Sequence, residues 1–241
     1  MYNRQTGFRF GPQLTPMVKY LIIACVAVFI WTALGGLEII QILGLVPARF
    51  WPPDLWLWQG ITYIFLHGDF FHLLMNMFVL WMFGSTLEAH WGSSQFLRFF
   101  FITGIGAGLL SAAVDYSSYI PIIGASGAIY GLLAAFGMLF PERPIFIYFI
   151  LPIKAKYFVL LTAGLVLFSS LGDAGSGIAH FAHLGGMLVG FLYLKGWLTP
   201  NGLRQAYYRW KIKRMRSRFE VYENRNRPAQ SKRRDDDFWI N

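Results

Sequence analysis

A serine flanked by small residues is the first candidate for chemistry in this chain. It lies in Gly124-Ala125-Ser126-Gly127, just after Pro121 and at the start of an apolar run. The first turn of a helix has unpaired backbone amides that can donate to a developing oxyanion, and flanking glycines let a substrate backbone come close to the hydroxyl. The pattern also fits a packing role, because small residues are common where membrane helices meet.

Two further groups of polar residues lie inside apolar runs. His72 and Asn76 are four residues apart, and His180 and His183 are three residues apart. Polar side chains inside membrane spans usually face a partner or a water-filled cavity. A serine nucleophile, a histidine base, and an amide with a second histidine as oxyanion donors are what acyl transfer requires. The residue types therefore favour Ser126 as a nucleophile.

A catalytic triad is not expected, because no acidic residue lies in the spans at the same depth. Asp173 is in the loop before the last apolar run, and Glu88 is at the far end of the second. We expect a Ser-His dyad whose imidazole is oriented by packing. Tyr130 lies one turn after Ser126 on the same helix face, and its ring can stack on that imidazole.

Metal binding is the main chemical alternative. His180-x-x-His183 places two imidazoles on one helix face, but there is no H-E-x-x-H motif, and His90 is expected at the opposite membrane face. We predict neither a metal nor a cofactor.

The composition is that of a polytopic membrane protein. Of the 241 residues, 56% are hydrophobic and only 14% are charged, and the mean hydropathy is +0.46. Soluble domains have about 25% charged residues. The single cysteine, Cys25, excludes an intrachain disulfide.

The predicted fold is an all-α membrane bundle of six spans, residues 17–198, between an N-terminal segment, 1–16, and a basic tail, 199–241. The loop 35–69, rich in Trp and Pro, is expected to lie in the membrane interface without crossing it. The six apolar runs are Met17 to Leu34, Phe70 to Thr86, Phe96 to Val114, Ser126 to Phe140, Tyr157 to Leu171 and Ile178 to Leu198. The fourth run is about 22 Å of helix against a bilayer core of about 30 Å. Ser126 is therefore expected at the bottom of a cavity.

Lys and Arg gather on one side of this topology, which predicts that both termini are cytoplasmic. The polar residues of spans two, four and six then share one depth, in the outer leaflet. The tail, with seven basic residues between Arg204 and Arg218, is expected to lie on anionic lipid. Nucleic-acid binding is not expected, because no recognition motif accompanies the basic residues.

Spans four and six carry small residues at every fourth position, which permits close backbone contact. These are Gly127, Gly131 and Ala135 on one span, and Ala182, Gly186 and Gly190 on the other.

Taken together, the motifs resemble the rhomboid intramembrane serine proteases over about Trp56 to Leu198. The motifs are Gly124-Ala125-Ser126-Gly127 with Tyr130, His72-x-x-x-Asn76, and Ala182-His183-x-x-Gly186-x-x-x-Gly190. The resemblance implies that Ser126 is the nucleophile and His183 the base. It also implies that His72 and Asn76 donate to the oxyanion, that Tyr130 packs on His183, and that Glu88 forms hydrogen bonds near the cytoplasmic end of span two. One departure is Trp58-Gln59, where the family often has Trp-Arg, which leaves the anchoring of that loop open.

The predicted function is a serine endopeptidase that cleaves single-span membrane proteins in or near the outer half of the bilayer. A rhomboid-like pseudoprotease that binds or escorts membrane clients is the alternative, and a transporter or channel is a third. The predicted location is a prokaryotic plasma (inner) membrane. A transit peptide is the competing interpretation of the first 16 residues, which contain no acid but are short and lack serine.

Overall fold

The computed structural model of the chain describes residues 11–147, 150–172, 177–196 and 212. The chain forms two compact units, Met1–Leu194 and Lys195–Asn241. Only three residues of the second unit are described. The predicted contact of the basic tail with lipid therefore lies outside the described residues and stays a prediction.

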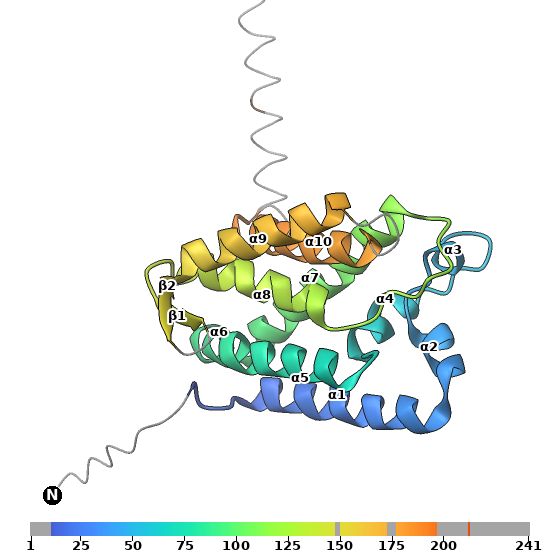
Figure 1. Cartoon of the computed structure of the whole chain (residues 1–241), viewed down its shortest axis with the longest axis horizontal. Helices are drawn as coiled ribbons and strands as arrows, with labels where there is room; N and C mark the ends of the chain where they lie inside the picture. Colours follow the sequence, from blue (N-terminus) through green and yellow to red (C-terminus); the bar gives the residue numbers. More distant parts are fainter. Residues whose placement is uncertain (1–10, 148–149, 173–176, 197–211, 213–241) are drawn as a thin grey trace, which may run out of the picture. The chain divides into compact units, whose positions relative to one another are not determined.

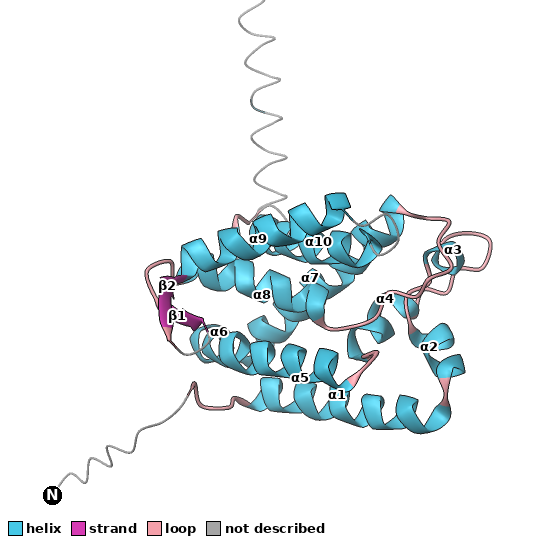
Figure 2. Cartoon of the chain, viewed as in Figure 1, coloured by secondary structure: helices cyan, strands magenta, loops and turns pink. Residues whose placement is uncertain are grey.

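The first unit is almost entirely helical (Figure 2). Its helices are α1 (Pro16–Gly35), α2 (Leu37–Leu43), α3 (Pro47–Phe50), α4 (Gln59–Thr62), η1 (Tyr63–Phe65), α5 (Phe70–Val79), η2 (Leu80–Gly84), α6 (Ser85–Trp91), α7 (Ser93–Val114), α8 (Ser126–Leu139), α9 (Ala155–Gly172) and α10 (Gly177–Leu194). The segments α5, η2 and α6 form one continuous helix, in which η2 is a π-helical stretch. This helix runs five residues beyond the predicted end of the second apolar run, Thr86.

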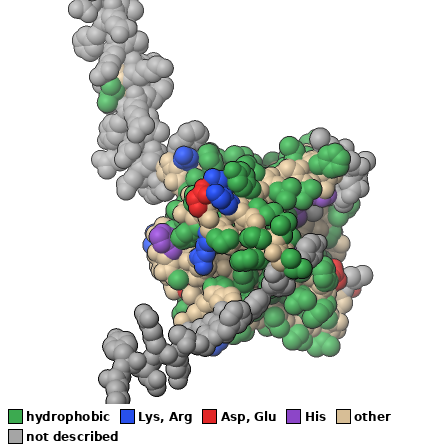
Figure 3. Space-filling model, turned by 60° about the vertical axis from the view of Figure 1, so that its left-hand side comes forward, with side chains coloured by type: hydrophobic (Ala, Val, Ile, Leu, Met, Phe, Trp, Pro, Cys, Tyr) green, Lys and Arg blue, Asp and Glu red, His purple; other side chains and the backbone are tan. Residues whose placement is uncertain are grey.

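Three described helices are long and apolar enough to cross a membrane: Pro16–Gly35, Phe70–Trp91 and Ser93–Val114. Three shorter apolar helices are Ser126–Leu139, Ala155–Ser169 and His180–Leu194. The face drawn in Figure 3 is mostly hydrophobic, with only a few charged side chains. A mostly helical membrane fold is thus confirmed, while the number of six spans stays a prediction. The loop between α1 and α5 contains the short helices α2, α3, α4 and η1, and its place in the membrane interface also stays a prediction.

Helix α8 is the centre of the unit. Ten of its 14 residues are buried, and it packs against α7 and α10 (Figure 1). A helix surrounded by other helices needs small residues where backbones meet. A Cβ built on Gly131 would lie 2.6 Å from Thr103 of α7, and one built on Gly190 would lie 3.0 Å from the Gly131 carbonyl. The small-residue stripes therefore face other helices.

An antiparallel hairpin joins α8 to α9 and was not predicted from the sequence. Strands β1 (Pro144–Ile147) and β2 (Leu151–Lys154) pair with Pro144 opposite Lys154. Glu142, just before β1, forms ion pairs with Lys154 and Lys156. Hydrogen bonds from these two lysines lower the pKa of Glu142 to about 2, so the carboxylate is charged at neutral pH.

Glu88 ties the beginning of α1 to the end of α6. Its carboxylate accepts hydrogen bonds from the hydroxyls of Thr15 and Ser93 and from the backbone N–H groups of Met17 and Val18. Free N–H groups at a helix N-terminus favour an anion. This explains why an acidic side chain that is only 3% exposed is stable there.

The tightest contact between α8 and α10 yields a prediction for stability. A Cβ on Gly186 would overlap the carbonyl of Gly127, the residue after Ser126. We expect Gly186→Ala to push the helices apart and to lower the melting temperature by several degrees, with a parallel loss of activity. Melting and cleavage of the purified variant measure both effects.

Gly164 is the matched control, because a Cβ there meets nothing within 4 Å. Gly164→Ala should leave stability unchanged or raise it slightly, since alanine favours the helix. Equal melting of the wild type and Gly186→Ala would contradict the close packing of α8 on α10.

Candidate active site

The hydroxyl of Ser126 and the imidazole of His183 meet between α8 and α10. Ser126 is the first residue of α8, and its Oγ lies 2.8 Å from Nε2 of His183. No described side chain caps the N-terminus of α8. The hydroxyl therefore lies within hydrogen-bonding distance of a base, at a helix end whose backbone amides can stabilise negative charge.

The imidazole of His183 is held by ring stacking. The ring of Tyr130 stacks on it with a centroid distance of 4.4 Å and an interplanar angle of 16°. Its Nδ1 is buried and has no hydrogen-bond partner among the described residues. In the described part of the chain, the imidazole is thus oriented by ring stacking, and no acidic side chain forms a hydrogen bond with it.

His72 and Asn76 lie one turn apart on α5. Asp69 caps this helix, since its side chain accepts a hydrogen bond from the His72 backbone N–H at 2.8 Å. The side-chain amide nitrogen of Asn76 is buried and has no partner in the part of the chain that the structure describes. A buried donor without an acceptor is rare in native proteins, and a ligand or reaction intermediate that accepts from it would satisfy it.

Gly124 brings His72 close to Ser126. Its φ is +116°, a region that favours glycine. A Cβ built there would lie 2.9 Å from Nε2 of His72 and 3.7 Å from Oγ of Ser126. The imidazole and the hydroxyl therefore flank the same stretch of backbone. Gly127 has a similar steric role, because its Cβ would lie 2.7 Å from Ala107 on α7.

His67 also belongs to this region, although the sequence predicted no role for it in the site. Its ring is 2% exposed and contacts the ring of His72 edge-on at a centroid distance of 5.1 Å. Burial, with a smaller contribution from His72, lowers the pKa of His67 to about 4, so the ring is neutral at neutral pH. The sequence feature that could have placed His67 at the site is its position, five residues before His72 in the segment that leads into α5.

The ring of His180 contacts the ring of His183. It lies 6.4 Å from the His183 ring at an interplanar angle of 90°. Among the described residues, no group of three or more His, Cys, Asp or Glu side chains is arranged to hold a metal ion. Of the two histidines of α10, it is His183 that reaches the serine.

Gln59, the second residue of the Trp58-Gln59 pair, anchors the loop between α1 and α5. Its side chain is fully buried, with Oε1 accepting from Val46 N–H and Nε2 donating to the carbonyls of Gln41 and Ile42. Trp58 also donates to Ile42, through Nε1 at 2.9 Å. A neutral amide satisfies three backbone groups here without burying a charge, which would be costly in this environment.

Comparison with known proteins gives a consistent result. A family model described as "Rhomboid domain" matches residues 55–199. The chain is 35% identical over 152 residues to "Rhomboid protein 1, mitochondrial" of Saccharomyces cerevisiae, covering 60% of this chain and 42% of that protein. It is 32% identical over 175 residues to "RHOMBOID-like protein 5" of Arabidopsis thaliana, covering 69% and 54%. It is also 35% identical over 144 residues to "Presenilin-associated rhomboid-like protein, mitochondrial" of Homo sapiens, covering 54% and 35%. The chain thus matches about half or less of the length of these relatives.

The predicted location in a prokaryotic plasma membrane, with both termini cytoplasmic, is wrong on these findings. These relatives are eukaryotic, and the yeast and human proteins are named as mitochondrial. The error has a simple cause: apolar runs and charge asymmetry report that a chain crosses a bilayer, but they do not report which bilayer.

Proposed function

The chain belongs to the rhomboid family, and from this premise we propose that it is an intramembrane serine endopeptidase acting through Ser126 and His183. Its substrates would be single-span membrane proteins, cut in or near one half of the bilayer by a bundle of six spans. The observation that carries the proposal is the 2.8 Å separation between Oγ of Ser126 and Nε2 of His183. The side-chain nitrogen of Asn76, which has no hydrogen-bond partner among the described residues, supports it further.

The proposed reaction begins with proton transfer from the Ser126 hydroxyl to Nε2 of His183 as Oγ attacks the scissile carbonyl carbon. The carbonyl oxygen becomes an oxyanion, which accepts hydrogen bonds from the Ser126 backbone N–H and the side chains of Asn76 and His72. His183 then gives its proton to the leaving amine nitrogen, and the C–N bond breaks to leave an acyl ester on Ser126. Water, deprotonated by His183, then attacks this ester. The bond between the acyl carbon and Oγ breaks as His183 returns the proton to Oγ, which releases the carboxylic acid and restores the free serine.

The substrate segment has to be unwound at the cleavage point. A peptide carbonyl inside a helix is already hydrogen-bonded and cannot easily be presented to Ser126. We therefore propose substrates with helix-breaking Gly or Pro near a small residue at the cut. The names of the yeast and human relatives favour a mitochondrial membrane as the place of action.

The test is cleavage of a panel of tagged single-span proteins in proteoliposomes that contain the full chain. Mass spectrometry of both products gives the cut site, which we expect within one half of the apolar segment. Clients that bind without being cleaved, together with wild-type protein that does not react with a serine-directed probe, would instead identify a pseudoprotease.

Loss of a single oxyanion donor is expected to slow the reaction without stopping it. Removing one such donor lowers turnover by about 10² to 10³ in serine proteases. Asn76→Ala and His72→Ala should each keep trace cleavage. Asn76→Ala should melt close to the wild type, because its amide nitrogen has no described partner to lose. Wild-type turnover in both variants would remove the oxyanion role.

A further inference from the structure

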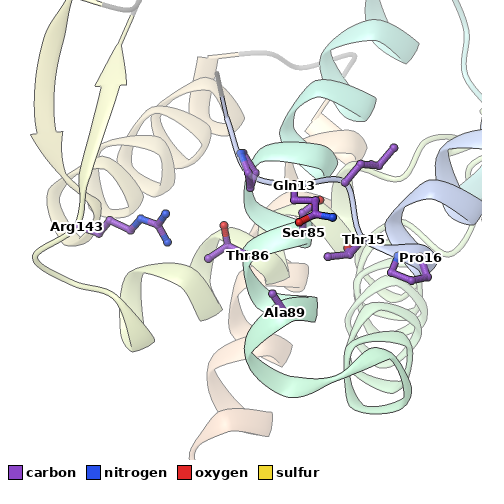
Figure 4. Close-up of a pocket in the computed structure, with 9 residues that line it drawn as sticks. Gln13, Thr15, Pro16, Ser85, Thr86, Ala89 and Arg143 are labelled. Carbon is purple, nitrogen blue, oxygen red and sulfur yellow. The ribbon is translucent and has the colours of Figure 1, made fainter. Parts of the chain in front are cut away.

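A cavity of about 470 Å³ opens at the end of the unit away from the dyad (Figure 4). It lies between the segment that leads into α1, one side of α6, and Arg143 after α8. Ser85, which lines it, is on the same continuous helix as His72, roughly 20 Å further along the axis. The proposed catalysis does not use this cavity.

Arg143 brings a positive charge to the cavity. In Figure 4 its guanidinium group extends toward Thr86 on α6. The neighbouring Glu142 is already paired with two lysines, and no ion pair of Arg143 is found within the described residues. The guanidinium carbon lies 5.7 Å from the centre of the Phe136 ring and 6.0 Å from that of Phe140. Its planar set of N–H donors suits phosphate, which it can bind with two parallel hydrogen bonds.

Ser85 supplies the second, independent observation. Its side chain is 1% exposed, and its Oγ has no hydrogen-bond partner among the described residues. A buried hydroxyl in a native protein nearly always has a partner, so a ligand oxygen that accepts from Ser85 would satisfy it. The amide of Gln13, which also lines the cavity, is a further donor.

The other polar groups near the cavity do not compete for this role. Thr15 donates to Glu88, and Thr86 donates to the Met82 carbonyl at 3.3 Å. The Glu88 carboxylate is not part of the cavity lining, and it already accepts from four donor groups. The donors free to face a ligand are therefore those of Arg143, Ser85 and Gln13.

The cavity lies where α1 begins, beside Ser85, Thr86 and Ala89 in the last two turns of the continuous helix Phe70–Trp91, and next to Arg143 just after the end of α8. Ends of apolar helices lie at the depth of lipid headgroups, and basic pockets between membrane helices are suited to anionic headgroups. Leu14, 45% exposed, lines the cavity, and Tyr20 on α1 is 60% exposed. Further along α1, the side chains of Ile23, Ile30 and Leu34 are also exposed, so the exposed side of this helix is largely apolar.

We propose that this cavity binds the phosphate headgroup of a membrane phospholipid. Arg143 holds two phosphate oxygens, Ser85 and Gln13 donate to the remaining polar atoms, and the acyl chains lie along the exposed side of α1. Free inorganic phosphate shares the same chemistry but lacks the acyl chains, so the two sources can be told apart.

The experiment is native mass spectrometry of the full chain in neutral detergent, titrated separately with dioleoylphosphatidylglycerol, dioleoylglycerol and inorganic phosphate. We expect one tightly retained phosphatidylglycerol and much weaker binding of the other two. Arg143→Gln should raise the Kd of that lipid about tenfold or more, because a charge-assisted hydrogen bond contributes about 1.5–3 kcal/mol. Ser85→Ala should raise it by a smaller factor.

Arg98→Gln is the matched control, because Arg98 lies in the second turn of the adjacent helix α7, is exposed, and has Ser94 as its hydrogen-bond partner. This variant should bind the lipid as the wild type does. Arg143→Lys keeps the positive charge but lacks the two parallel N–H donors of the guanidinium. An intermediate Kd for this variant supports the proposed geometry and shows that the site folds without the arginine. Equal weakening by Arg98→Gln and Arg143→Gln, equal retention of dioleoylglycerol, or phosphate binding as tight as that of the lipid would each overturn the proposal.

Discussion

Replacing Ser126 by alanine is expected to abolish cleavage and labelling by a serine-directed fluorophosphonate together. Loss of the nucleophile costs about 10⁶-fold in turnover in other serine proteases. The substitution removes only the hydroxyl group, whose one described hydrogen bond is to His183. The fold should therefore be unchanged. Labelling of the purified protein, followed by melting of the same sample, measures chemistry and stability separately.

The matched control is Ser117→Ala, because Ser117 is an exposed serine in the loop before α8 whose one described hydrogen bond is to Asp115. It should label and cleave as the wild type does. Labelling that persists in Ser126→Ala would place the nucleophile elsewhere. Absence of labelling in both the wild type and the Ser117 variant would favour the pseudoprotease alternative.

The second large effect is expected at His183 and not at His180. His183→Ala should abolish both cleavage and labelling, because Nε2 of His183 is the nitrogen that lies 2.8 Å from the hydroxyl. His180→Ala should keep a substantial fraction of each. The centre of the His180 ring lies 6.4 Å from that of the His183 ring, and the two rings are perpendicular. Both variants are assayed as purified, folded protein.

His183→Phe separates the base from the stacking partner. A phenyl ring can still stack on Tyr130, as the imidazole does at 4.4 Å, but it cannot accept a proton. This variant should therefore melt closer to the wild type than His183→Ala while remaining inactive. Activity in His183→Phe, or loss of activity in His180→Ala alone, would move the base to His180.

The sequence by itself determined the properties that depend on local order along the chain. Apolar runs of helical length predicted membrane helices, because each residue inside a bilayer has to be apolar or partnered. The spacing His72-x-x-x-Asn76 placed two polar side chains one turn apart, since helical periodicity is the same in every fold. The short polar motifs and the small-residue stripes, found together in one sequence, also indicated the rhomboid family, which the family model confirms.

The tertiary structure alone decided what depends on the register between elements. Ser126 and His183 are separated by 57 residues, and whether their side chains meet depends on how α8 packs against α10. Local spacing leaves that packing open, because sliding one helix by a single turn of about 5.4 Å keeps each helix intact and breaks the contact.

The same reasoning applies to the contacts that the sequence left unspecified. Gln59 forms hydrogen bonds with three backbone groups in a segment that ends 13 residues earlier, and no pattern in the sequence predicts these partners. The partners of Glu88 were likewise left unspecified, since Thr15, Met17 and Val18 lie 70 to 73 residues earlier in the chain. These hydrogen bonds exist only once the helices have packed, so the physical information lies in the assembled structure.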